Sequence, residues 1–190
     1  MEHSDHVHLL RPANLPAGGA WADLGAGSGA FTLALRELIG SAAELYAVDR
    51  DPARLAELER GWQTRFGSPE RLHLILADFT GSADLLGGPA GGFPPMDGLL
   101  MANSLHFFKD QEKVLQHVRS FLKPGGALLL VEYNVDSANP WVPHPLSFET
   151  WRGLAPRAGF SQPRLLATRP SSFLREFYAA LAYNSPASRS

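Results

Sequence analysis

The 190-residue chain contains no cysteine. This absence excludes disulfide bonds, a thiolate nucleophile, and any zinc or iron–sulfur site built on cysteine ligands. It is typical of proteins kept in a reducing compartment, so we expect a cytoplasmic location.

Long apolar runs and an excess of basic charge are also missing. No run approaches the roughly 20 apolar residues that cross a bilayer, and residues 1–8 lack a signal-peptide pattern. Lys and Arg number 17 against 19 Asp and Glu, a net charge of −2 that does not favour nucleic-acid binding. We therefore expect neither a membrane nor a nucleic-acid partner, while a homo-oligomer is left open.

The N-terminus is polar and rich in histidine. His3, His6 and His8, together with Asp5, have the composition of a short metal-binding tract. Polar terminal segments are more often poorly ordered, so we predict a frayed arm and no metal site.

Short apolar runs alternate with amphipathic stretches along most of the chain. This alternation predicts an α/β fold, in which a mostly parallel sheet is covered by helices on both faces. The predicted strands are residues 20–24, 44–48, 72–77, 98–102 and 127–133, followed by a hairpin near 164–168 and 173–183. Two helices are predicted to begin after residues 29 and 51, and two more are predicted over residues 111–122 and 147–158. Loops are predicted at 81–95, with a turn at 82–86, at 123–126, and in the Pro-rich segment 139–145.

A glycine-rich turn follows the first predicted strand, in Asp23-Leu24-Gly25-Ala26-Gly27-Ser28-Gly29. Glycines let a ligand approach the backbone, because they have no side chain to collide with it. Gly25, Gly27 and Ala30 also satisfy the dinucleotide fingerprint G-x-G-x-x-G/A. The turn alone leaves open a bound NAD, a bound S-adenosylmethionine, or a packing turn without a ligand.

Three carboxylates distinguish these ligands. Asp23 lies two residues before Gly25, where it suits a cationic amino-acid group and not a pyrophosphate. Asp49 ends the second strand and can accept from ribose hydroxyls, as it also would in an NAD enzyme. Asp78, followed by Phe79, can accept from an adenine amino group. An alternative for each of these acids is an N-cap or a solvated turn carboxylate. We prefer that alternative for a fourth acid, Asp51, which precedes Pro52. Together the three acids favour S-adenosylmethionine.

Five motifs in this order resemble the class I (Rossmann-like) S-adenosylmethionine-dependent methyltransferases. They are Asp-Leu-Gly-Ala-Gly-Ser-Gly at 23–29, Val-Asp at 48–49, Ala-Asp-Phe at 77–79, Asn103, and Leu-Lys-Pro-Gly-Gly at 122–126. The resemblance covers residues 21–133 and, more loosely, residues up to 183. It implies a seven-stranded, mostly parallel sheet whose last strand is antiparallel. It also implies a cofactor site made of Asp23, Gly25, Ala26, Gly27, Gly29, Asp49, Arg50, Asp78, Phe79 and Asn103.

We expect a single methyltransferase domain over residues 1–190. Residues 1–19 would form a short N-terminal arm, 20–133 the cofactor-binding core, and 134–190 a substrate-side helix and strand hairpin. The short arm, the Pro-rich segment or a second subunit would then have to cover the site.

The acceptor side offers few candidates. Methyl transfer is an in-line displacement, so the protein must chiefly align the acceptor and exclude water. Asn103 and His106 follow the fourth strand, and His106 is a candidate catalytic base for a hydroxyl acceptor; its alternative is a packing or capping role. The sequence Asn103-Ser104-Leu105-His106 lacks the Asn-Pro-Pro-Tyr of amino-group methyltransferases. Asn103 and Glu132 are too few oxygen ligands for magnesium.

The aromatic residues near the Pro-rich segment are candidates for the lining of an acceptor pocket. Trp141, His144, Phe148 and Trp151 gather there in the sequence, although Trp151 has the spacing of a core residue.

The sequence leaves three classes of function open. Transfer of a methyl group to a small-molecule acceptor is the first, with an RNA or protein acceptor kept as a variant. A non-catalytic S-adenosylmethionine-binding or scaffold protein is the second. An NAD-dependent oxidoreductase is the third, and the chain lacks the Tyr-x-x-x-Lys or substrate domain that it would need.

Overall fold

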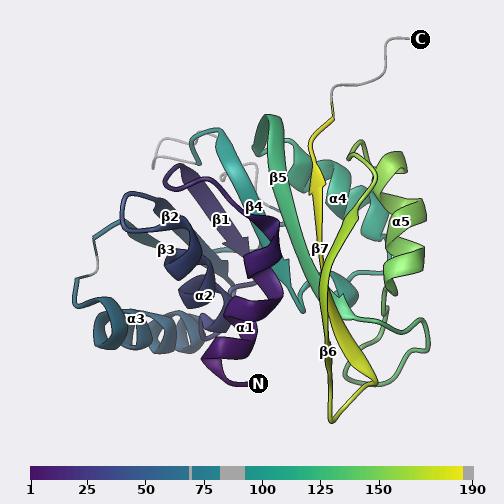
Figure 1. The fold of residues 1–190 in the computed structure, drawn as a ribbon, viewed down its shortest axis with the longest axis horizontal. Coiled ribbons are helices and arrows are strands. Elements are labelled where there is room, and N and C mark those ends of the chain that lie inside the picture. The colour runs from purple at the N-terminus through teal and green to yellow at the C-terminus, as the bar shows by residue number, and fades with distance from the viewer. Residues whose placement is uncertain (69, 82–92, 186–190) are drawn as a thin grey trace.

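A seven-stranded sheet forms the centre of the molecule. The computed structural model describes residues 1–68, 70–81 and 93–185. The strand order is β3-β2-β1-β4-β5-β7-β6 (Figure 1). The strands are β1 (Ala20–Leu24), β2 (Glu44–Asp49), β3 (Leu72–Leu76), β4 (Met96–Ala102), β5 (Leu122–Tyr133), β6 (Arg164–Pro170) and β7 (Glu176–Tyr183). Strands β1 to β5 pair in parallel, and β7 is antiparallel to both β5 and β6. The predicted sheet and its antiparallel last strand are confirmed.

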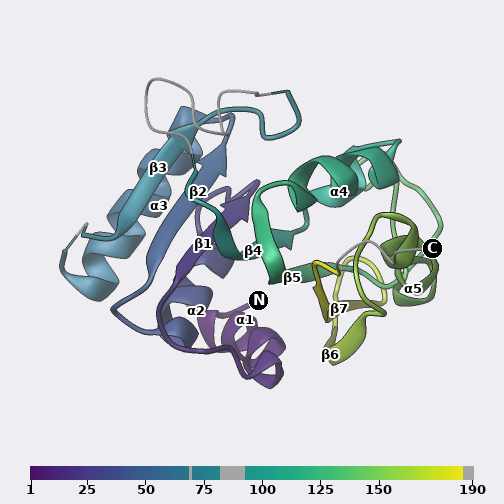
Figure 2. The ribbon, with the colours of Figure 1, turned by 90° about the horizontal axis from the view of Figure 1, so that it is seen from above.

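Helices cover both faces of the sheet. Their bounds are α1 (His3–Leu10), α2 (Ala30–Ile39), α3 (Pro52–Phe66), α4 (Gln111–Arg119) and α5 (Phe148–Arg157). Apolar side chains of α1, α2 and α3 belong to one core cluster, and those of α4 and α5 belong to a second. Figure 2 shows α1 and α2 on one side of the strands and α4 on the other. The sheet is therefore buried on both faces, as near-continuous apolar strands such as β5 require.

Local signals in the sequence account for most helix boundaries. The Asp51 side chain accepts from the backbone N–H groups of Ala53 and Arg54, which caps α3 as predicted. Leu55, Leu58 and Trp62 form the buried stripe of that helix. Ser147 caps α5 by accepting from the Thr150 N–H.

The prediction of a frayed N-terminal arm was wrong. Residues 3–10 form α1, which packs against α2 and β6 and buries Val7, Leu9 and Leu10. The Glu2 N–H donates to Asp5 Oδ2 at 2.8 Å, and this bond satisfies a backbone donor that the helix start would leave unpaired. Apolar burial on one face outweighs the polar composition that suggested disorder.

Other boundaries also differ from the prediction, and three of them lie in α4, β4 and β5. Helix α4 ends at Arg119, because Leu122 already pairs with Met96 as the first residue of β5. Residues 123–126, predicted as a turn, lie inside β5. They fall where the pairing of β5 with β4 is irregular, between the pairs Met96–Leu122 and Gly98–Ala127. Strand β4 starts at Met96, two residues before the predicted start. The turn predicted at 82–86 lies outside the described residues.

No helix in the described part of the chain combines the length and the apolar composition needed to cross a bilayer. The chain order reverses at β1, which lies between β2 and β4. In open α/β sheets ligands bind outside the carboxyl ends of the strands at such a point.

Candidate functional site

A cavity of about 810 Å³ opens at the carboxyl ends of β1, β2 and β4. Nine of the ten residues predicted for the cofactor site line it: Asp23, Gly25, Ala26, Gly27, Asp49, Arg50, Asp78, Phe79 and Asn103. The segments that carry them are separated by up to 80 positions in the sequence, and the parallel topology brings them to one edge of the sheet.

The glycine-rich turn between β1 and α2 forms one wall of the cavity. Gly25 has φ of +82°, and a Cβ added there would lie 2.7 Å from the Ser104 Cβ, so a side chain is excluded. Gly29, the tenth predicted residue, does not line the cavity. A Cβ on Gly29 would lie 2.4 Å from Leu58 Cγ, so this glycine allows α2 and α3 to pack closely.

Asp23 is buried at the end of β1, with 1% of its surface exposed. Its Oδ2 accepts a hydrogen bond from Thr32 Oγ1 at 2.6 Å, while its Oδ1 has no partner among the described residues. Burial raises the pKa of Asp23 to about 7; the nearby Asp49 adds to the increase, and the Thr32 bond opposes it. The carboxyl group is therefore suited to a cationic partner that enters the cavity.

Asp49 and Asp78 hold backbone turns at the ends of their strands. Asp49 Oδ2 accepts from the Gly27 N–H at 2.8 Å and Oδ1 from the Asp51 N–H at 2.9 Å. Asp78 Oδ1 accepts from both the Thr80 hydroxyl and the Thr80 N–H, and these bonds lower the pKa of Asp78. These hydrogen bonds hold both side chains in place at the cavity wall.

Four buried polar atoms without a hydrogen-bond partner belong to residues that line this cavity. Within the described part of the chain they are His6 Nδ1, Asp23 Oδ1, Asn103 Oδ1 and Ser104 Oγ. Asn103 also has φ of +53°, a left-handed conformation that asparagine adopts more readily than most residues other than glycine. Because buried polar atoms are nearly always paired, this concentration indicates a polar ligand site.

His106 and Glu132 form a buried pair beside the cavity. The His106 Nδ1 lies 2.6 Å from Glu132 Oε2, and the two residues are 3% and 0% exposed. Glu132 Oε1 accepts from the backbone N–H groups of Leu105 and His106 at 3.0 and 3.3 Å. Where Glu132 is the acceptor, Nδ1 is the donor of this bond, and in a neutral imidazole Nε2 is then left as an acceptor. His106 does not line the cavity itself, but the adjoining Phe107 and Ser104 do.

Sequence reasoning missed several residues of the site. Glu132 was weighed only as a metal ligand, because its pairing with His106 joins positions 26 apart. Thr32 looks like an ordinary helix residue until Asp23 is placed beside it. His6 and Met1 reach the cavity through α1, which the sequence did not predict. Among the described residues, no group of three or more His, Asp or Glu could hold a metal ion.

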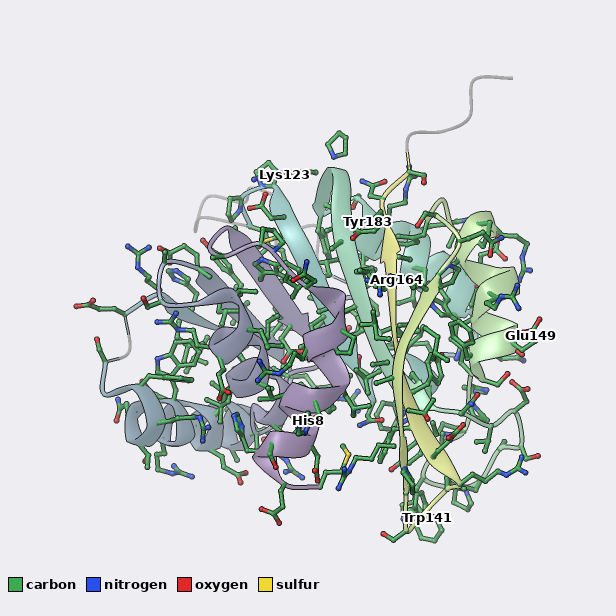
Figure 3. All side chains as sticks on the ribbon, viewed as in Figure 1. His8, Lys123, Trp141, Glu149, Arg164 and Tyr183 are labelled. Carbon is green, nitrogen blue, oxygen red and sulfur yellow. The ribbon has the colours of Figure 1, made fainter. Side chains whose placement is uncertain are left out.

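The predicted aromatic cluster near the Pro-rich segment is divided. Trp151 is fully buried in the core, as its spacing predicted, and Phe148 packs against Tyr178. Trp141 is 70% exposed and lies next to Phe173 of the β6–β7 connection (Figure 3). These side chains do not line the cavity at the strand ends.

Comparison with known proteins identifies a family. A family profile described as "Methyltransferase domain" matches residues 2–176. The hybrid PKS-NRPS synthetase fsa1 of Fusarium sp. (strain FN080326) is 31% identical over 111 residues, which are 58% of this chain and 3% of that protein. The chain therefore spans only a small part of the curated relatives it matches.

Solved structures share the fold. A carbon methyltransferase, CurJ, superposes with a TM-score of 0.71 at 21% identity, over 92% of this chain and 51% of that one. The Burkholderia thailandensis 1,6-didemethyltoxoflavin-N1-methyltransferase, solved with 1,6-didemethyltoxoflavin and S-adenosylhomocysteine, has a TM-score of 0.70 at 20% identity. That match covers 97% of this chain and 78% of that one.

Proposed function

Because the chain belongs to the methyltransferase-domain family, we propose that it transfers the methyl group of S-adenosylmethionine to a small-molecule acceptor. One observation carries the proposal: four unpaired, buried polar atoms belong to residues of the cavity at the strand ends, Asp23 Oδ1 among them. Its 810 Å³ volume lies within the range of cofactor and small-molecule sites.

The residues of the cavity match the parts of this cofactor. Asp23, buried with an unpaired oxygen, suits the ammonium group of the methionine moiety. Asp49, held by the Gly27 N–H, suits the ribose hydroxyls, while Asp78 and Phe79 suit the adenine base. When bound, S-adenosylmethionine supplies an electrophilic methyl group on a sulfonium.

His106 is proposed as the catalytic base, with Glu132 as its positioning residue. The Nδ1–Glu132 bond fixes the ring and the tautomer, so Nε2 is the atom that takes a proton. The buried Glu132 carboxylate also stabilises the imidazolium that proton transfer creates. This arrangement supports a catalytic role for His106 over the packing role that the sequence also allowed.

A base of this kind suits an acceptor whose reacting atom carries an acidic proton. We propose a carbon acid, a CH group between two carbonyl groups, because the similar proteins include a carbon methyltransferase and PKS-NRPS synthetases. His106 Nε2 would take the proton from carbon, and the carbon electron pair left behind would form the new bond to the methyl group that bound S-adenosylmethionine would supply, with S-adenosylhomocysteine as the leaving group.

The test uses methyl-labelled S-adenosylmethionine and three model acceptors: a β-keto thioester, a phenol and an aromatic amine. We expect label in the β-keto thioester alone, at the carbon between the carbonyls, with His106→Asn as the inactive control. Transfer to the phenol alone would replace the carbon acid with the hydroxyl acceptor expected from the sequence. Cofactor binding without transfer to any acceptor would support the non-catalytic alternative.

The domain organisation belongs to the same proposal. The described residues build one sheet with two core clusters, and this supports a single methyltransferase domain with α1 as part of it. The cytoplasmic location expected from the sequence stays a prediction.

A further inference from the structure

The N-terminal helix brings an imidazole to the cavity, beside the first turn of α2. His6 is 8% exposed, and its ring packs edge-on against Phe31 with 4.6 Å between the ring centroids. Both residues line the cavity together with Asp23. His6 therefore lies where α1 closes over the start of α2.

Nδ1 of His6 is buried and has no hydrogen-bond partner in the described part of the chain. Leaving a buried polar atom unpaired costs free energy, so such an atom indicates a missing partner. The helix that carries it is fixed on two sides, since Asp5 pairs with Arg169 of β6 at 2.9 Å and His3 with Glu37 of α2 at 2.9 Å. The ring is thus held against the cavity.

Burial and neighbouring positive charges favour the uncharged form of the imidazole. Burial lowers the pKa of His6, and the positive N-terminus and His3 lower it further. A neutral imidazole has one N–H donor, which it can offer to an anion without carrying a charge into the protein.

The start of α2 supplies further donors at the same place. This helix is ten residues long, and its N-cap residue, Gly29, has no side chain that could accept a hydrogen bond from the first N–H groups. The first N–H groups of a helix lack intrahelical acceptors and favour negative charge. Ala30 and Phe31 of this turn line the cavity next to His6.

We infer that His6 is a cofactor-recognition residue, which donates from Nδ1 to the carboxylate of the methionine moiety at the start of α2. The ammonium group of the methionine moiety, which carries the positive charge, would pair with Asp23. This division follows from charge, because a buried carboxylate suits a cation, whereas an imidazole N–H and a helix N-terminus suit an anion. The inference rests on the proposed cofactor site, and it makes α1 a part of that site.

The experiment compares two ligands that differ only in the carboxylate, S-adenosylmethionine and its decarboxylated form. Calorimetry measures their affinities for the full-length wild type, His6→Ala, His6→Asn and His8→Ala. His8 lies on the exposed side of the same helix and is the matched control (Figure 3).

We expect His6→Ala to weaken S-adenosylmethionine binding about tenfold, the effect of losing one hydrogen bond to a charged group. The decarboxylated ligand should lose almost nothing. His6→Asn should restore much of the difference, since its side-chain amide can donate from near the Nδ1 position, and His8→Ala should leave both affinities unchanged.

The ratio of the two affinities decides the result, because undocking of α1 would weaken both ligands alike. An unchanged ratio in His6→Ala would overturn the inference. If the wild type bound neither ligand, the cofactor assignment itself would fall, and that result is distinct from a wild type that binds both.

Discussion

The buried carboxyl group of Asp23 lowers the stability of the folded protein but favours the binding of a cationic ligand. Its pKa of about 7 lies above the usual 3.8, so between these two pH values the folded protein holds a proton that the unfolded chain has lost. The free energy of unfolding therefore contains a penalty that is absent below about pH 4, grows as the pH rises, and is complete above about pH 7.

Asp23→Asn should remove this penalty. At pH 8 the variant should gain on the order of 1–3 kcal/mol in free energy of unfolding, and at pH 4 the gain should vanish. The amide oxygen can still accept from Thr32 Oγ1, so the local packing is kept. Urea denaturation of both proteins at the two pH values measures the difference.

The same variant should bind S-adenosylmethionine more weakly, because it lacks the charge that faces the ammonium group. A variant that was more stable and also bound the cofactor normally would remove Asp23 from the site.

The His106–Glu132 pair predicts a separation of rate from affinity. His106→Asn should lower kcat by ~10²–10⁴ and leave cofactor affinity nearly unchanged, because a base acts on the acceptor. Steady-state kinetics measures the rate, and calorimetry measures the affinity.

Glu132→Gln is the finer variant of this pair. Its amide oxygen can still accept from the Leu105 and His106 N–H groups, but its NH₂ would face Nδ1 and favour the other tautomer. We expect a lower kcat in a folded protein. Full activity in this variant would show that Glu132 only supports the fold.

Helix α1 is fixed partly by a charge pair that can be removed. Asp5→Ala breaks the bond to Arg169 and the bond from the Glu2 N–H. We expect faster hydrogen exchange in residues 3–10 and a global loss of only ~1 kcal/mol, because Val7, Leu9 and Leu10 stay buried. Exchange mass spectrometry checks this, and Glu149→Ala, whose pair with Arg152 is exposed, is the control.

Elements with strong local signals could be predicted from the sequence. The cap at Asp51, Pro52 and the stripe of Leu55, Leu58 and Trp62 agree with one helix, and the structure has that helix. Helix α1 could not be predicted, since its buried side chains are few and only contact with α2 and β6 makes them a core. The irregular start of β5 depends on β4, whose register shifts between Met96 and Gly98.

The residues of the site could likewise be predicted only where a local sequence pattern marks them. The residues after β1, β2 and β3 were found because each follows an apolar strand, and parallel strands bring their ends together. The role of Glu132 was missed because no residue near it in the sequence, at the end of β5, indicates that its partner is His106, 26 positions earlier. Long-range pairing, as between His106 and Glu132, is set by the fold and not by local pattern.

The whole molecule should respond to its cofactor by mass action. A ligand that binds only the folded state at 100 times its Kd adds about 2.7 kcal/mol of stability. For a chain of this size that raises Tm by roughly 5–10 °C. S-adenosylhomocysteine should produce this shift in differential scanning fluorimetry and NAD should not. A shift with NAD alone would contradict the cofactor assignment.

Strand β7 occupies a position between β5 and β6, although it is the last strand in the chain. Its six residues 177–182 are buried, so β5 has an exposed edge until β7 arrives. During synthesis on a ribosome, residues 20–133 leave the tunnel well before β7 does, and their apolar edge then has no neighbour. Such an edge can pair with another chain, so we expect chains that lack β7 to aggregate more readily than chains that have it.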